Sequence, residues 1–275
     1  MQRVDILKVL SEVPEKYKSN MMYRFVRKSN RQIRWFIRNN EIEKSKKDVR
    51  YDTYAEELDT LKDKHRGERC FLICTGPSIN NTDLSLLKDE VCFGVNAVYK
   101  LPVLCKYFAV ADYENVWVKH KNGIFNYGCD YIFLGGAVAR WYLKNNYKKA
   151  AVIPLREHSY LRESKEIVDP IQGVPKAHHV PVSVCLPLIK HMGFTETYLL
   201  GTDCTYEKEH HFYGTEDPNE MDHTKRPKYW DEVFNEYEIV KKIFENDGKK
   251  IYNTTVGGML EVFERIKLED VINDK

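Results

Sequence analysis

Apolar and polar residues change their spacing along the chain close to Gly67. From this glycine onward, short apolar runs alternate with stretches in which apolar residues recur every three or four positions. Short runs bounded by Gly, Pro or Asn predict buried strands, and the longer spacing predicts helices. The predicted strands cover 70–74, 91–96, 107–110, 131–134, 151–154, 197–200 and 250–253. The predicted helices cover 83–88, 114–121, 138–146, 182–191, 230–246 and 259–263.

Strands that alternate with helices of this size predict an α/β domain, because right-handed crossovers between them build a mostly parallel sheet. We therefore expect a Rossmann-like sheet flanked by helices over residues 67–275. Two predicted loops, 156–177 and 204–229, are long for a compact domain. Loops of such length often cover a functional site.

Residues 1–66 contain no glycine and predict a helical extension. Between Lys16 and Arg38 the chain carries eight cations and no carboxylate, and its apolar residues follow helical spacing. Such a basic amphipathic helix either lies on an anionic membrane surface or packs on the main domain or on a second copy of the chain. A homo-oligomer therefore stays open, and nothing else in the sequence is arranged to bind nucleic acid.

The composition is typical of a globular cytoplasmic protein. No stretch approaches the roughly 20 apolar residues of a membrane span, and the first residues do not begin a secretory signal. The seven cysteines are irregularly spaced and lie mostly in apolar segments, as buried free thiols do in a reducing compartment. We expect a cytoplasmic protein that the basic helix can hold on the inner face of the plasma membrane.

The first predicted strand runs directly into Thr75, Gly76, Pro77 and Ser78. Open α/β sheets form nucleotide crevices in this way, at the carboxyl ends of their strands. The alternative is an ordinary strand and turn, because the stretch lacks the further glycines of a dinucleotide motif and the Lys of a P-loop.

Polar residues also follow later strands, at Asn96, Asp112, Gly201-Thr202-Asp203 and Asn253. These ends share one edge of a parallel sheet, so they can converge on a ligand. The Asn96 amide both donates and accepts, which suits a base or a ribose. Taken singly, each residue is equally typical of a turn or an N-cap.

Two carboxylates, Asp112 and Glu114, stand two positions apart, as in metal-dependent glycosyltransferases that hold Mg²⁺ beside a diphosphate. The signal is weak, and we predict no metal site. Farther along, His178 and His179 precede a predicted helix that contains Ser183, and a helix amino end with a nearby hydroxyl predicts either an anion site or a plain N-cap.

The long loop near residue 210 concentrates histidine and tyrosine. A zinc site from His210, His211 and His223 is conceivable, but adjacent histidines point apart and no Cys or carboxylate completes the spacing. General acid–base catalysis is the better explanation of these histidines, because histidine titrates near neutral pH and can take a proton from a sugar hydroxyl. Tyr206 and Tyr213 can donate to a leaving phosphate, whereas the alternative is a solvated loop.

Five stretches occur in order, at 71–79, 93–96, 200–203, 210–213 and 251–263. This set resembles the MptE-like domain family, which includes archaeal hydroxymethylpterin pyrophosphokinases and the core of motility-associated flagellin glycosylation factors. The Gly-Pro-Ser turn and Asn96 are also similar to those of bacterial lipooligosaccharide sialyltransferases. The resemblance covers about residues 67–268, outside the basic helix.

The sialyltransferase resemblance implies a variant glycosyltransferase A-type fold and a metal-independent, inverting transfer from a CMP-activated sugar. It implies that His223 is the catalytic base and that Tyr206 and Tyr213 hold the leaving phosphate. Thr75 stands where those enzymes carry Asn, and 179–183 replaces their Arg-X-Thr-Ser-Gly segment. The residues that it assigns to the nucleotide are Gly76, Pro77, Ser78, Asn96, Gly201 and Asp203; the strand-end and helix-start positions add Thr75, Asp112 and Ser183.

We therefore expect a glycosyltransferase of bacterial surface-glycan assembly (capsule, lipopolysaccharide or lipooligosaccharide). Its donor is a nucleotide sugar, its acceptor is a glycan or a lipid-linked glycan, and it needs no further cofactor. One alternative is a Mg²⁺-dependent pyrophosphokinase that transfers diphosphate from ATP to a pterin-like alcohol. The other is a non-catalytic subunit that binds a nucleotide or glycan.

Overall fold

The computed structural model describes residues 40, 42–205, 211–214 and 228–273 of the chain. The chain from Asp48 to Lys275 forms one compact unit, and Met1–Lys47 forms another. The predicted basic helix lies outside the described residues, as do Tyr206, His210 and His223.

Residues 48–66, which the sequence groups with the helical extension, are part of the larger compact unit. They form η1 (Val49–Tyr54) and α4 (Ala55–Asp59). Tyr51, Leu58 and Leu61 are buried in the core of that unit. This segment is therefore the first part of the α/β domain and not of the helical extension.

Within the described residues, ten strands form two sheets, and every pair of neighbouring strands is parallel. The large sheet confirms the predicted Rossmann-like, mostly parallel arrangement. Its strands are β1 (Arg69–Ile73), β2 (Cys92–Val95), β3 (Tyr107–Val110), β4 (Tyr131–Leu134), β5 (Val152–Pro154), β8 (Glu196–Leu200), β9 (Lys250–Asn253) and β10 (Glu264–Arg265). The small sheet contains β6 (Glu157–Tyr160) and β7 (Val174–Lys176).

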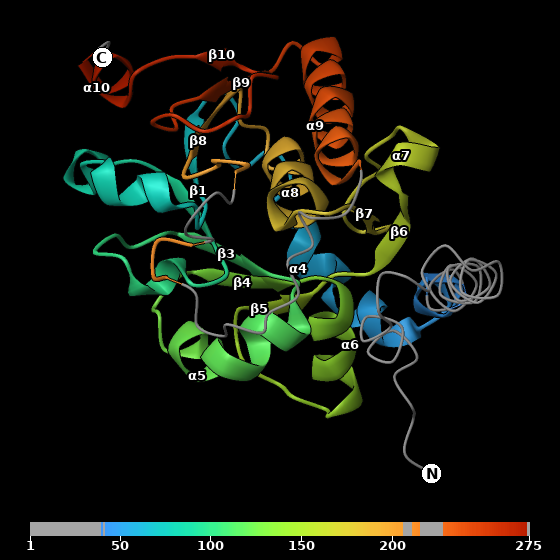
Figure 1. Cartoon of the computed structure of the whole chain (residues 1–275). Coiled ribbons are helices and arrows are strands. Elements are labelled where there is room, and N and C mark those ends of the chain that lie inside the picture. The colour runs from blue at the N-terminus through green and yellow to red at the C-terminus, as the bar shows by residue number, and fades with distance from the viewer. Residues whose placement is uncertain (1–39, 41, 206–210, 215–227, 274–275) are drawn as a thin grey trace, which may run out of the picture. The chain divides into compact units, whose positions relative to one another are not determined.

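The strand order of the large sheet is β10-β9-β8-β1-β2-β3-β4-β5. From β1 the chain builds outward through β2 to β5, and it then returns to place β8 on the other side of β1 (Figure 1). The carboxyl ends of β1 and β8 therefore flank the topological switch point. Open α/β sheets bind ligands in the crevice outside such a point.

Helices cover both faces of the large sheet, with α5 and α6 on one side of β3–β5 and α8 and α9 on the other (Figure 1). The α-helices of the domain are α4, α5 (Val118–Phe125), α6 (Gly136–Lys144), α7 (Leu161–Ser164), α8 (Leu186–His191), α9 (Tyr229–Asn246) and α10 (Leu268–Asn273). Short 3-10 turns form η1, η2 (Pro77–Asn81), η3 (Leu84–Leu87) and η4 (Val98–Lys100). Single π-helical turns form η5 (Tyr113–Trp117) and η6 (Pro181–Cys185), which lead into α5 and α8.

Two predictions of local structure are wrong. Residues 259–263 are not helical, because they form an irregular segment between β9 and β10. The predicted loop 156–177 contains β6, α7 and β7. Polar residues such as Glu157 and His158 in β6 hide these short elements from a search for apolar runs.

β1 is the central strand of the core. Phe71, Leu72 and Ile73 have no exposed surface. Leu72 lies between Phe93 of β2 and Leu199 of β8 in the strand register. A strand buried on both faces needs apolar side chains at every position, which explains why this run does not alternate with polar residues.

We expect Leu72→Ala to lower the free energy of unfolding by about 2–5 kcal/mol, because it opens a cavity in the close-packed core. Urea unfolding of the purified protein measures the change. Leu104→Ala is the matched control, since Leu104 is 65% exposed and its truncation should change the stability by less than about 0.5 kcal/mol. Equal effects of the two substitutions would contradict the central placement of β1.

Candidate functional site

The turn after β1 stays attached to the end of β8. The Cys74 amide donates to the Leu200 carbonyl at 2.8 Å, and the Gly76 amide donates to the Gly201 carbonyl at 2.8 Å. These bonds carry the strand pairing of β1 and β8 beyond the last strand residues. The predicted nucleotide turn therefore lies directly at the switch point.

Asp203 fixes this turn with its carboxylate. It accepts hydrogen bonds from the Ser78 amide at 3.1 Å and from the Ser78 hydroxyl at 2.7 Å. The Asp203 side chain is buried, and this burial raises its pKa above 3.8, against the opposing effect of the Ser78 hydrogen bonds. The donors of Ser78 are therefore used inside the protein, and Asp203 acts as the support of the turn.

Glycine is required at position 76 because a side chain would clash with neighbouring atoms, and not because of its backbone conformation. Its φ is −63°, which any residue adopts. A Cβ at this position would lie 1.9 Å from Asp203 Oδ2 and 2.5 Å from the Gly201 carbonyl oxygen. The missing side chain thus lets the Asp203 carboxylate approach the backbone of the turn.

Asn96, at the end of the neighbouring β2, differs from these residues because its side-chain oxygen is not satisfied by the protein. Its φ of +55° places it in the left-handed region, which Asn tolerates better than most residues. Its backbone amide donates to the Ala109 carbonyl at 3.1 Å. Its Oδ1 atom is buried and has no hydrogen-bond partner in the described structure. A buried acceptor without a partner marks a place where a ligand donor fits.

Asp112 caps the helical segment that follows β3. Its carboxylate accepts from the Asn115 amide and from the Asn115 side chain, both at 3.0 Å. This is the N-cap role that the sequence left open beside nucleotide binding. The structure brings Asp112 to the same edge of the sheet as Asn96, because β2 and β3 are neighbours.

The segment 211–214 crosses the end of β1. The Phe212 amide donates to the Thr75 carbonyl at 2.9 Å, and Asn80 Nδ2 donates to the Phe212 carbonyl at 3.0 Å. His211 Nδ1 lies 3.1 Å from the Thr75 hydroxyl oxygen. The predicted nucleotide turn and part of the histidine loop therefore meet in the structure.

Tyr213 brings this segment to residues that the sequence analysis missed. Its ring stacks on His211 at a centroid distance of 5.0 Å and meets the His120 ring edge-on at 6.0 Å. The Lys100 ammonium lies 4.4 Å from the centre of the Tyr213 ring, and the Tyr99 hydroxyl lies 3.0 Å from His120 Nδ1. No spacing signal in the sequence links these residues, which come from η4, α5 and 211–214.

The predicted anion site at the start of η6 is occupied by protein contacts. The amides of Val182 and Ser183 donate to the His179 carbonyl, and Ser183 is buried. His178 binds Glu236 through its amide and its Nδ1 atom, both at 2.8 Å.

The partly buried His179 ring lies near two tyrosine hydroxyls. Its Nδ1 atom is 3.4 Å from the Tyr237 hydroxyl, and its Nε2 atom is 3.2 Å from the Tyr229 hydroxyl. Burial lowers the pKa of His179 to about 4. His179 is therefore neutral near pH 7 and ties η6 to α9 rather than carrying a charge for a ligand.

The polar turn after β9 forms hydrogen bonds within itself and with the turn after β8. Asn253 donates to the Leu260 carbonyl and accepts from the Thr255 amide. The Met259 amide donates to the Asp203 carbonyl at 2.7 Å, next to Gly258, where a Cβ would overlap Asp203. This turn thus holds the backbone of Asp203 from the side opposite β1.

The seven cysteines are free, and six of them are buried. Burial raises the pKa of Cys74 to about 12 and that of Cys129 to about 11. Among the described residues, no group of three His, Cys, Asp or Glu side chains is placed to hold a metal ion. In the same part of the chain, no helix is both long and apolar enough to cross a membrane.

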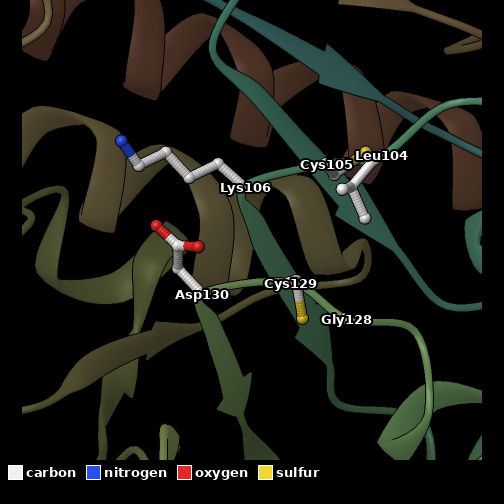
Figure 2. A pocket seen from close by; sticks show the side chains of 6 residues that line it. All are labelled: Leu104, Cys105, Lys106, Gly128, Cys129 and Asp130. Carbon is white, nitrogen blue, oxygen red and sulfur yellow. The ribbon is translucent and has the colours of Figure 1, made fainter.

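A hollow of about 300 Å³ lies at the amino ends of β3 and β4, opposite the carboxyl ends of the strands. Figure 2 shows the side chains of Lys106 and Asp130 extending to the same side of the two segments that line it. None of the residues predicted to bind the nucleotide lines this hollow. The polar carboxyl edge, with Asn96 and Thr75, is therefore the stronger candidate for the functional site.

No protein-family model matches this sequence, and no curated protein matches it significantly. The resemblance to the MptE-like family and the roles of Tyr206 and His223 stay predictions.

We expect Gly76→Ala to lower the free energy of unfolding by about 3 kcal/mol, because the new methyl group overlaps the Asp203 carboxylate and the Gly201 carbonyl. Denaturant unfolding measures the loss. Gly128→Ala is the control: its Cβ meets no atom within 4 Å, but its φ is +83°, so it reports a backbone cost of about 1 kcal/mol. A Gly76→Ala protein as stable as wild type would contradict the close approach of Asp203.

The raised pKa of Asp203 predicts a pH dependence of stability. The folded protein binds the Asp203 proton more tightly than the unfolded chain, so the ionised carboxylate disfavours folding above its pKa. This penalty on folding is absent below pH 3.8. It grows as the pH rises from 3.8 to the raised pKa of Asp203, and it is constant at higher pH.

Asp203→Asn keeps an oxygen for the Ser78 amide and removes the charge. We expect the stability of wild type, relative to this variant, to fall as the pH rises from about 4 and then to level off. Urea unfolding at several pH values and constant ionic strength measures the difference. A difference that is independent of pH would exclude the raised pKa.

Proposed function

We propose that the carboxyl edge beside the switch point binds the nucleotide of a CMP-activated sugar, and that the protein transfers this sugar to an acceptor hydroxyl. The observation that carries the proposal is the buried, unpartnered Oδ1 atom of Asn96. Asn96 directly follows β2, the neighbour of β1, and the carboxyl end of β1 lies at the switch point, where open α/β sheets bind ligands.

The amide of Asn96 matches the hydrogen-bonding edge of cytosine. Oδ1 accepts from the exocyclic amino group, and Nδ2 donates to the neighbouring ring nitrogen. A buried acceptor left without a partner disfavours the folded state by about 1–3 kcal/mol, and a bound base removes that penalty. The backbone of Asn96 is held by its amide, which donates to the Ala109 carbonyl at 3.1 Å.

The transfer itself requires one base and one leaving group. As the acceptor oxygen bonds to the sugar, its proton passes to an imidazole, and the bond between the sugar and the CMP phosphate oxygen breaks. The resemblance assigns the proton to His223, with Tyr206 and Tyr213 at the phosphate. His211, whose imidazole lies beside Thr75, is the alternative base on a described segment.

The same Asn96 geometry also fits the amino group of adenine, which keeps the Mg²⁺-dependent pyrophosphokinase as a second candidate. A glycan or a lipid-linked glycan is the proposed acceptor. The cations between Lys16 and Arg38 support a lipid-linked acceptor, because they attract an anionic membrane surface.

Thermal-shift measurements with CMP, UDP, GDP and ATP, each with and without Mg²⁺, test the proposal. We expect CMP to raise the melting temperature of the full-length protein without added metal, because a ligand that binds the folded state stabilises it. Stabilisation by ATP with Mg²⁺ alone would favour the pyrophosphokinase. Stabilisation by none of them would contradict a nucleotide site.

Asn96→Gly tests directly whether the Asn96 side chain binds the nucleotide. Glycine accepts the φ of +55°, so the turn keeps its backbone and loses only the amide. We expect CMP to bind roughly tenfold more weakly or worse, as measured by calorimetric titration. Asn146→Gly is the matched control, because Asn146 is exposed and also has a positive φ, of +51°. Equal CMP affinity in wild type and Asn96→Gly would remove Asn96 from the site.

A further inference from the structure

Four side chains from three separate segments gather beside the end of β1. Lys100 ends η4, His120 lies on α5, and His211 and Tyr213 belong to the segment that crosses Thr75. Tyr213 is the common neighbour, with both imidazole rings and the Lys100 ammonium against its ring.

The backbone places this cluster close to the proposed base site. η4 begins at Val98, two residues after Asn96, so Lys100 follows Asn96 within one short turn. Thr75, which contacts His211, lies in the turn after β1, and Asn96 follows the neighbouring strand β2. The cluster and Asn96 therefore lie on the same edge of the sheet, within reach of one nucleotide.

The chemistry of the cluster suits an anion with several oxygens. The Lys100 ammonium lies 4.4 Å from the centre of the Tyr213 ring, and an ammonium group is attracted to phosphate oxygens. Imidazole N–H groups and a phenol hydroxyl donate hydrogen bonds to phosphate oxygens. Bonds in which the donor or acceptor is ionised are shorter and roughly twice as strong as neutral ones.

We propose that Lys100, His120, His211 and Tyr213 form an anion subsite that binds the phosphate of the nucleotide. This inference rests on the proposed nucleotide function and adds to it a cation, Lys100, and a histidine, His120, which neither the sequence pattern nor the resemblance supplies. The subsite neutralises the charge of the phosphate while Asn96 selects the base.

Comparing the affinity for CMP with that for cytidine measures the contribution of the phosphate to binding. Both ligands present the same base and ribose, so the ratio of their affinities measures what the phosphate adds. We expect Lys100→Met, which keeps most of the aliphatic stem and removes the charge, to reduce this ratio on the order of tenfold and to leave the cytidine affinity unchanged. Calorimetric titration of the full-length protein at fixed ionic strength measures both affinities.

Lys106→Met is the matched control, because Lys106 precedes β3 at the opposite edge of the sheet (Figure 2). It should leave the ratio of CMP to cytidine affinity at the wild-type value. If CMP and cytidine bind but Lys100→Met leaves their ratio unchanged, the anion subsite is wrong and the nucleotide function stands. If neither ligand binds the wild-type protein, the proposed function and the subsite both fail.

Discussion

The contact between the Asp203 carboxylate and the β1 turn is the constraint on which the carboxyl edge depends. It joins Ser78 to a residue 125 positions later, across the two strands that flank the switch point. Because Gly76 has no side chain, the carboxylate reaches the turn, and the Met259 amide holds the Asp203 backbone from the other side. Three segments distant in sequence thereby become one connected rim, which fixes the position of the end of β1 relative to the end of β8.

The polar residues at the strand ends divide into two groups once their partners are known. Ser78, Asp203, Asp112 and Asn253 direct their side chains to other parts of the protein, so they shape the turns. Asn96 leaves an oxygen without a partner at the same edge. Position at a strand end therefore does not identify a binding residue. Asn96 differs from these four residues in its unused hydrogen-bonding capacity, a property that it shares with the buried Thr202 hydroxyl after β8.

This division also shows how far the sequence could predict the molecule. β1 was predictable because full burial leaves an uninterrupted apolar run, and the parallel sheet followed from the alternation of strands and helices. β6 was not, because Glu157 and His158 break the apolar pattern. The proximity of His120 to the segment 211–214 was not predictable for another reason. The π-helical turn Tyr113–Trp117 precedes α5, and its wider turn changes the direction in which later side chains such as His120 point.

The two halves of the candidate site are built differently, and this has a consequence for stability. The rim around Asp203 is satisfied internally and does not need a ligand to be complete. Asn96, in contrast, keeps a buried acceptor unpaired in a left-handed backbone conformation, two features that each disfavour the folded state unless something compensates. The strands β1 and β2, which are buried at every position except Arg69, supply that compensation in the free protein. A ligand that donates to Asn96 then gains the hydrogen bond without reorganising the rim, because the rim is already fixed by Asp203.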